Sequence, residues 1–132
     1  MQLVTLYLST AFVFFIVDIF GLKYIIRPVF VRHIEDMLLD SYRFGPALVF
    51  YLFYILGLVY FVSAPALRDG SPGQAALGGA LLGGLAYGTY EFTNYATLKG
   101  WHWQMVVVDL SWGMFLTGLA AGAGVLITRA IG

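Results

Sequence analysis

Three acidic residues lie in or beside the long apolar runs of this chain, and they are the residues best suited to chemistry. Asp18, Glu91 and Asp109 each stand among aliphatic and aromatic neighbours. A carboxylate in hydrocarbon is costly, so one that is retained there serves a function or pairs with a base. Grouped carboxylates could bind a cation, hold a metal, or take up and release protons. The sequence therefore predicts an acidic site inside an apolar chain.

Polar and aromatic residues accompany two of these acids at helical spacing. In an α-helix, residues three and four positions apart lie on one face. The residues that share a face with Glu91 or Asp109 in this way are Tyr87, Asn94, Tyr95 and Trp112. We expect these four side chains and the three acids to form a ligand-binding or proton-coupling site. No catalytic residue is assigned.

Each acid also has a structural alternative, because charges within a membrane often pair with one another. Asp18 could pair with Lys23 or Arg27, and Glu91 could pair with either of these bases across helices. Asp109 could cap the start of its helix or pair with Lys99. Under these alternatives the acids would be ion-pair partners with no ligand.

The two histidines are expected at the membrane surface. His102 lies between Trp101 and Trp103, a pattern typical of an aromatic interface belt. His33 falls in a mixed polar segment and is expected to face solvent or lipid headgroups. We therefore predict no metal site and no cofactor.

Four apolar runs must position these residues, at about 3–26, 46–67, 74–97 and 104–128. Each is long enough to cross a bilayer, which takes about 20 residues as helix. The predicted fold is therefore all-α, a polytopic membrane protein with four transmembrane helices in one bundle. The whole chain, 1–132, is expected to form this single domain, with the first run retained as a helix and not cleaved as a signal peptide.

The segment 29–43 between the first two runs is amphipathic at helical period. Phe30, Ile34, Met37 and Leu38 share one face, and most of the charges lie elsewhere. We favour an interfacial helix lying in the membrane plane. The alternative is that this segment extends the first helix, with Pro28 as the point of a break or of a new first turn.

Composition supports a membrane setting and excludes several classes of partner. Hydrophobic residues make up 61% of the chain and charged residues only 11%, whereas a soluble domain has about 25% charged. The expected solvent of this surface is the lipid bilayer. The formal net charge is zero, so no nucleic-acid partner is expected, and the absence of cysteine excludes thiol chemistry.

Basic residues predict the orientation. The connections between runs one and two and between runs three and four, with their flanks, hold Lys23, Arg27, Arg32, Arg43 and Lys99, and the opposite side holds Arg68 and Arg129. Positive charge favours the cytoplasm, so both termini are expected outside. In either orientation the helix spans bring the three acids toward one leaflet.

Glycine stripes mark where helices approach closely. Small residues recur at four-residue spacing, a common device of membrane helix packing. The glycines expected to pack helices are Gly79, Gly83, Gly84, Gly88, Gly118 and Gly122. These stripes could pack runs three and four within one chain, or they could form a homodimer or dock a larger membrane complex.

A longer motif carries a family resemblance. It runs from Tyr90 to Trp101 (YEFTNYATLKGW) and continues at 108–113 (VDLSWG). With this motif the chain resembles the small predicted bacterial membrane proteins called domain of unknown function 2177. The resemblance implies a four-helix protein of the bacterial inner membrane and assigns no activity.

Three functions stay open from the sequence. The first is binding or transport of a small amphiphile, lipid or cation through the acidic and aromatic cluster. The second is a non-catalytic accessory or scaffolding subunit of a larger membrane complex. The third is a membrane enzyme acting on a lipid, but no familiar catalytic motif supports it.

Overall fold

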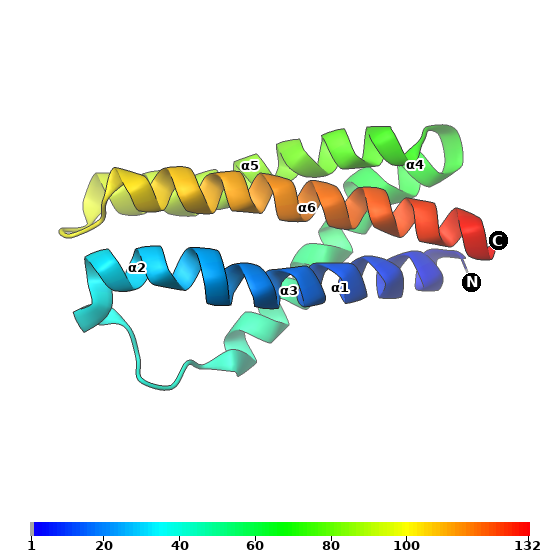
Figure 1. Ribbon diagram of the computed structural model, residues 1–132. Helices are drawn as coiled ribbons and strands as arrows, with labels where there is room; N and C mark the ends of the chain where they lie inside the picture. Colours follow the sequence, from blue (N-terminus) through cyan, green and yellow to red (C-terminus); the bar gives the residue numbers. More distant parts are fainter. Residues whose placement is uncertain (1) are drawn as a thin grey trace.

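The computed structural model describes residues 2–132, and this range contains helices, turns and loops but no strand. The polypeptide forms four helical rods, of which two are divided by π-helical turns (Figure 1). Its elements are α1 (Gln2–Gly21), η1 (Leu22–Ile26), α2 (Arg27–Ile34), η2 (Glu35–Met37), α3 (Phe44–Leu58), η3 (Val59–Ser63), α4 (Ala64–Asp69), α5 (Pro72–Thr97) and α6 (Trp103–Ile131). The predicted all-α class is confirmed.

Three of the rods are long and apolar enough to cross a membrane. They are Gln2–Met37, Phe44–Asp69 and Trp103–Ile131, with 36, 26 and 29 residues. The fourth rod, α5, has 26 residues and runs beside α6 (Figure 1). Its many glycines make it less hydrophobic than the others. The structure therefore supports a membrane protein with several apolar helices.

The first rod corrects the prediction of an interfacial helix at 29–43. Helix α2 continues α1 through Ile34, a 3₁₀ turn follows, and residues 38–43 form an irregular loop. Pro28 stands in the first turn of α2, directly after the π turn η1. A proline ring clashes with the carbonyl four residues earlier, and the wider π turn relieves this clash. The helix thus passes a proline that the sequence marks as a break.

The second rod also contains a π turn followed by a proline. Pro65 stands in the first turn of α4, directly after the π turn η3. The rod therefore continues to Asp69 and does not end near this proline, where hydropathy alone would place its end. Arg129 of α6 then closes the end of α4, because its Nη2 donates to the carbonyls of Ala66, Leu67 and Gly70 at 3.3, 3.2 and 2.7 Å. The C-terminal rod is thereby fastened to the turn between α4 and α5.

The six predicted packing glycines all lie in the seam between α5 and α6. A Cβ added at Gly79 would meet the Thr117 carbonyl at 2.8 Å, and one at Gly118 would meet the Ala76 carbonyl at 2.8 Å. The other four would face α6 or α5 in the same way: Gly83, Gly84, Gly88 and Gly122. Because these contacts join the two helices closely, the glycine stripes are used within the chain.

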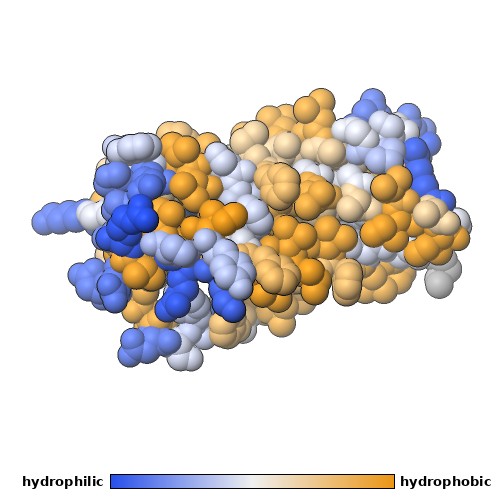
Figure 2. Space-filling model, viewed as in Figure 1, coloured by the Kyte–Doolittle hydropathy of each residue, from blue (hydrophilic) through white to orange (hydrophobic). Residues whose placement is uncertain are grey.

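The outer surface matches a lipid environment. On the face shown in Figure 2, apolar residues cover the middle of the molecule and hydrophilic residues gather toward its two ends. Large apolar side chains point outward in this belt; Phe12, Phe53 and Leu77 are 69%, 72% and 75% exposed. A soluble protein rarely exposes so continuous an apolar surface, so hydrocarbon must cover it.

Candidate functional site

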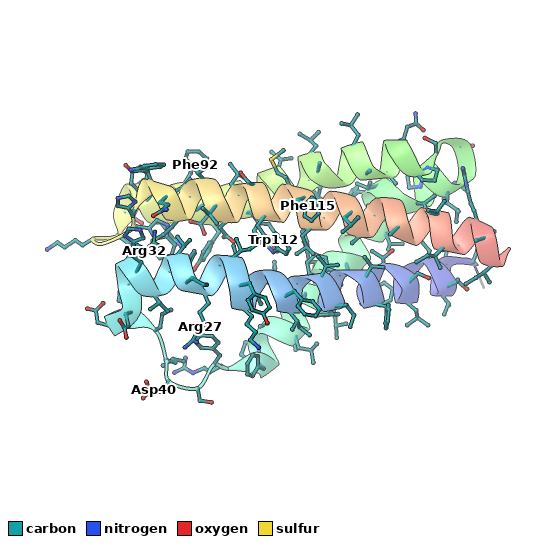
Figure 3. The ribbon with its side chains drawn as sticks, in the orientation of Figure 1. Arg27, Arg32, Asp40, Phe92, Trp112 and Phe115 are labelled. Atoms are coloured by element: carbon teal, nitrogen blue, oxygen red, sulfur yellow. The ribbon has the colours of Figure 1, made fainter. Side chains whose placement is uncertain are left out.

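Asp18 is buried near the middle of the first rod and contacts α6. Only 4% of the residue is exposed, and its Oδ1 accepts a hydrogen bond from Trp112 Nε1 at 3.1 Å. The Trp112 side chain lies between α6 and α1 (Figure 3). Gly21, one turn after Asp18, makes room for the indole, because a Cβ there would overlap the ring. Because the first rod continues to Met37, Asp18 lies farther from the end of its helix than it would if the helix ended near residue 26, as predicted.

Glu91 and Asp109 form a carboxyl pair between α5 and α6. Glu91 is fully buried and Asp109 is 8% exposed, and the two carboxyl groups are close enough to interact electrostatically. Glu91 Oε1 accepts a hydrogen bond from Trp101 Nε1 at 3.0 Å, while its Oε2 receives no donor. Two ionised carboxylates at such close range repel each other, which favours a proton on one of them.

Tyrosine side chains close the site on the side of α3 and α5. Tyr87 lies over Gly113 of α6, where a Cβ would overlap its ring. Its hydroxyl is buried beside the phenol of Tyr51, yet it makes no well-formed hydrogen bond. Tyr54 packs on Tyr87 with ring centroids 6.4 Å apart. The cluster therefore combines three acids with several aromatic rings.

Each of the two aspartates is followed by a glycine that seats an aromatic ring. Asp18 is followed three residues later by Gly21, and Asp109 is followed four residues later by Gly113. Each glycine seats an aromatic ring from a facing helix, Trp112 on the first and Tyr87 on the second. The glycines thus allow aromatic side chains to reach the acids.

No base neutralises these carboxylates within residues 2–132. Lys23 lies 5.3 Å from the centre of the Tyr24 ring, and Arg27 Nε donates to the Tyr42 hydroxyl at 3.1 Å. Lys99 is exposed, and the cap of α6 is His102, not an acid. The described residues therefore contain no ion pair for Asp18, Glu91 or Asp109.

Of the four remaining predicted site residues, two join the cluster and two do not. Trp112 and Tyr87 join the cluster, as described above. Asn94 is half-buried near Tyr90, and Tyr95 is 48% exposed. A helical face is wide, so residues that share it need not reach the same point.

Sequence reasoning missed Trp101, Tyr51 and Tyr54. Trp101 is of the residue type found in an interface belt. It is only 8% exposed, however, and it packs against Phe30 and Tyr90 with ring centroids 5.6 and 5.8 Å away. The two tyrosines come from α3. Their hydroxyl groups within an otherwise apolar run were the available signal.

A family comparison agrees with this description. The model of the family described as "Predicted membrane protein (DUF2177)" matches residues 3–126. The chain belongs to this family. The match spans all three acids and both indoles that donate to them, and it confirms the resemblance seen in the motifs at 90–101 and 108–113. No curated protein and no solved structure matches the chain.

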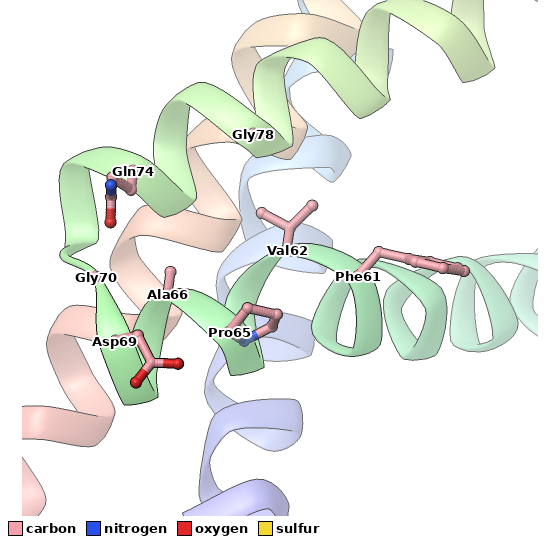
Figure 4. A pocket seen from close by; sticks show the side chains of 8 residues that line it. All are labelled: Phe61, Val62, Pro65, Ala66, Asp69, Gly70, Gln74 and Gly78. Atoms are coloured by element: carbon pink, nitrogen blue, oxygen red, sulfur yellow. The ribbon is translucent and has the colours of Figure 1, made fainter.

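Surface hollows of this DUF2177 protein lie away from the acids. One of about 380 Å³ opens between α4 and α5, at the turn that joins them (Figure 4). It is lined by Phe61, Val62, Pro65, Ala66, Asp69, Gly70, Gln74 and Gly78. A second lies along α2 and η2, from Val31 to Asp36. Neither of these two hollows is lined by Asp18, Glu91 or Asp109.

The two histidines, predicted as separate surface residues, meet at the end of the bundle. The rings of His33 and His102 stack with centroids 4.1 Å apart and planes 8° apart. Gln104 hydrogen-bonds to both, through its Oε1 to His33 Nε2 at 3.0 Å and through its backbone N–H to His102 Nδ1 at 3.1 Å. This contact joins α2 to the start of α6 and holds the loop that carries Trp101.

Replacing Gly21 tests the position of Trp112. Gly21→Ala is expected to lower the free energy of unfolding by about 1–3 kcal/mol, because the added methyl overlaps the indole and breaks its hydrogen bond to Asp18. The matched control is Gly57→Ala, since a Cβ there meets nothing within 4 Å. Unfolding in detergent micelles, followed by tryptophan fluorescence, measures both. Equal stability of the two variants would contradict the placement of Trp112 on Gly21.

Proposed function

We propose that this protein binds a cation at the acidic cluster in exchange for a proton. The supporting observation is the carboxyl pair of Glu91 and Asp109, buried between α5 and α6 with no base beside it. Such a pair cannot hold two negative charges in contact, so it must carry a proton or a bound cation. Exchange of one for the other is the chemistry this pair is suited to perform.

The surroundings favour reversible occupation. Asp18 keeps its indole donor from Trp112, and Glu91 keeps one from Trp101. Each indole satisfies one carboxyl oxygen without neutralising the charge. The remaining charge is therefore available to a ligand, and hydrogen bonds hold the carboxyl groups in place in both states.

The same proposal includes a four-span arrangement with α5 as a membrane helix. A helix of 26 residues is about 39 Å long, which exceeds the roughly 30 Å of a bilayer core. Its outward side carries Leu77, Leu81 and Leu85, which are 75%, 65% and 62% exposed at four-residue spacing. These leucines suit contact with lipid, and the opposite side of α5 packs on α6.

We further propose the bacterial inner membrane, with the loops 38–43 and 98–102 in the cytoplasm and both termini outside. Both loops lie at one end of the bundle, and the two termini lie at the other (Figure 1). Most basic residues outside the apolar belt belong to the loop end, which favours the cytoplasm for it. The acids would then lie in the cytoplasmic half.

Infrared spectroscopy of the protein in lipid nanodiscs tests the shared proton. At neutral pH we expect a C=O band of a protonated carboxylic acid, which ionised carboxylates lack. Glu91→Gln and Asp109→Asn should each abolish this band, because the amide supplies its own N–H donor and the remaining acid can ionise. The matched control is Glu35→Gln, an exposed acid, which should leave the band unchanged. A wild-type spectrum without the band would overturn the proposal.

A further inference from the structure

We infer that the cation exchanged at the acidic cluster is an amphiphilic organic cation, which reaches the carboxyl groups from the lipid between α3 and α5. This inference rests on the proposed function and names its ligand class. It combines two features of the molecule: the unusual exposure of the first turns of α3, and unpartnered polar atoms beside an aromatic wall.

The first turns of α3 have no partner within the chain. Residues 44–50 are exposed at every position, so no side of this helical segment is covered. The rod crosses α5 at its other end, where a Cβ on Gly78 would meet Val62 at 3.0 Å. From that crossing α3 diverges, and its Phe44 end lies far from α5 (Figure 1). Lipid or a ligand must therefore cover the surface between the two helices.

Unpartnered polar atoms lie beside this surface. The Tyr87 hydroxyl and Glu91 Oε2 are both buried, and neither has a hydrogen-bond partner among the described residues. Tyr51 and Tyr54 of α3 bring their rings beside Tyr87, and Tyr54 also hydrogen-bonds to Thr117 at 3.0 Å. Aromatic faces with a carboxylate attract an organic ammonium group more strongly than either does alone. The polar part of the site thus suits an organic ammonium group.

The apolar surface that leads to the site favours an organic cation with an apolar tail. Phe53, Leu81 and Leu85 are exposed on α3 and α5, at 72%, 65% and 62%. A chain that lies along them would point toward the crossing at Gly78, while its head stays at the acids. Residues 2–132 contain no group of three or more side chains placed to hold a metal ion, so the acids offer no ready cage to a bare ion. Charge and shape therefore select an amphiphile.

The test uses wild-type protein in nanodiscs and three probes. Dodecyltrimethylammonium carries head and tail, tetramethylammonium carries the head alone, and dodecanol carries the tail alone. We expect dodecyltrimethylammonium to displace the proton and remove the carboxylic-acid band at concentrations about 100-fold lower than tetramethylammonium. Burial of about four methylene groups accounts for such a factor. Dodecanol should leave the band in place, and Glu35→Gln should behave as wild type.

Three other outcomes overturn the inference in distinguishable ways. Equal potency of the two ammonium probes would leave cation exchange standing but remove the role of the tail. Loss of the band with dodecanol would show that bilayer perturbation, not binding, moves the proton. A band that persists under both ammonium probes would overturn the exchange of proton for cation as well.

Discussion

Gly83→Ala is expected to lower the free energy of unfolding by about 2–4 kcal/mol, whereas Gly84→Ala should change it by less than about 1 kcal/mol. A Cβ at Gly83 would overlap the Gly113 carbonyl oxygen and meet Thr117 Cβ at 2.9 Å. Backbone cannot yield as a side chain can, so α5 and α6 would have to separate. A Cβ at Gly84 meets the flexible Met114 side chain at 3.3 Å, which can move aside.

The two variants are adjacent and chemically identical, so their difference isolates the helix seam. Denaturation in mixed detergent micelles, followed by circular dichroism, measures both free energies. The same seam carries Glu91 and Asp109, and its separation should also abolish the carboxylic-acid band in Gly83→Ala. Similar stabilities for the two variants would show that α5 does not pack on α6 through Gly83.

The glycine positions show what a sequence pattern can and cannot determine. Four-residue spacing of small residues predicts close helix approach, and all six glycines lie where α5 and α6 approach each other. Spacing alone left open whether the partner is another helix of the chain or another protein. The answer depends on which face of α6 meets α5, and helix rotation within a bundle is set by all the packed side chains together. With the glycines used internally, they give no support to an accessory subunit.

The sequence predicts where the acids lie along their helices but not which side chains they contact. Hydropathy places Asp18, Glu91 and Asp109 in corresponding parts of three helices, so their convergence follows from topology. Which acids pair does not follow, because it depends on helix order and rotation. Asp18 meets an indole, and the other two meet each other. The ion pairs considered for them require long basic side chains to turn inward, but Lys23 and Arg27 contact tyrosines instead.

Helix continuation at Pro28 was not predictable from periodicity. Proline removes one backbone donor, and an amphipathic stretch after it favours a separate interfacial helix. A single π turn absorbs the proline and keeps α1 and α2 in one rod. The extra residue of a π turn does not change the hydropathy pattern. The sequence therefore does not predict the longer helix, or the distance of Asp18 from its end.

Trp101 and Trp103 stand two residues apart and are equally aromatic, yet they should respond very differently to substitution. Trp101→Phe is expected to lower the free energy of unfolding by about 2–3 kcal/mol, because fully buried Glu91 loses its indole N–H donor. Trp103 is 59% exposed, so Trp103→Phe should change the free energy by less than about 0.5 kcal/mol. Chemical denaturation in micelles, read by circular dichroism, compares them.

The double variant separates lost packing from the lost hydrogen bond. If the cost of Trp101→Phe comes from an unsatisfied Glu91, adding Glu91→Gln should recover part of it, since an amide is cheaper to bury without that donor than an acid is. A cost that is unchanged by Glu91→Gln would assign it to the contacts of the ring with Phe30 and Tyr90. Equal costs for Trp101→Phe and Trp103→Phe would return Trp101 to the interface belt and leave Glu91 without its support.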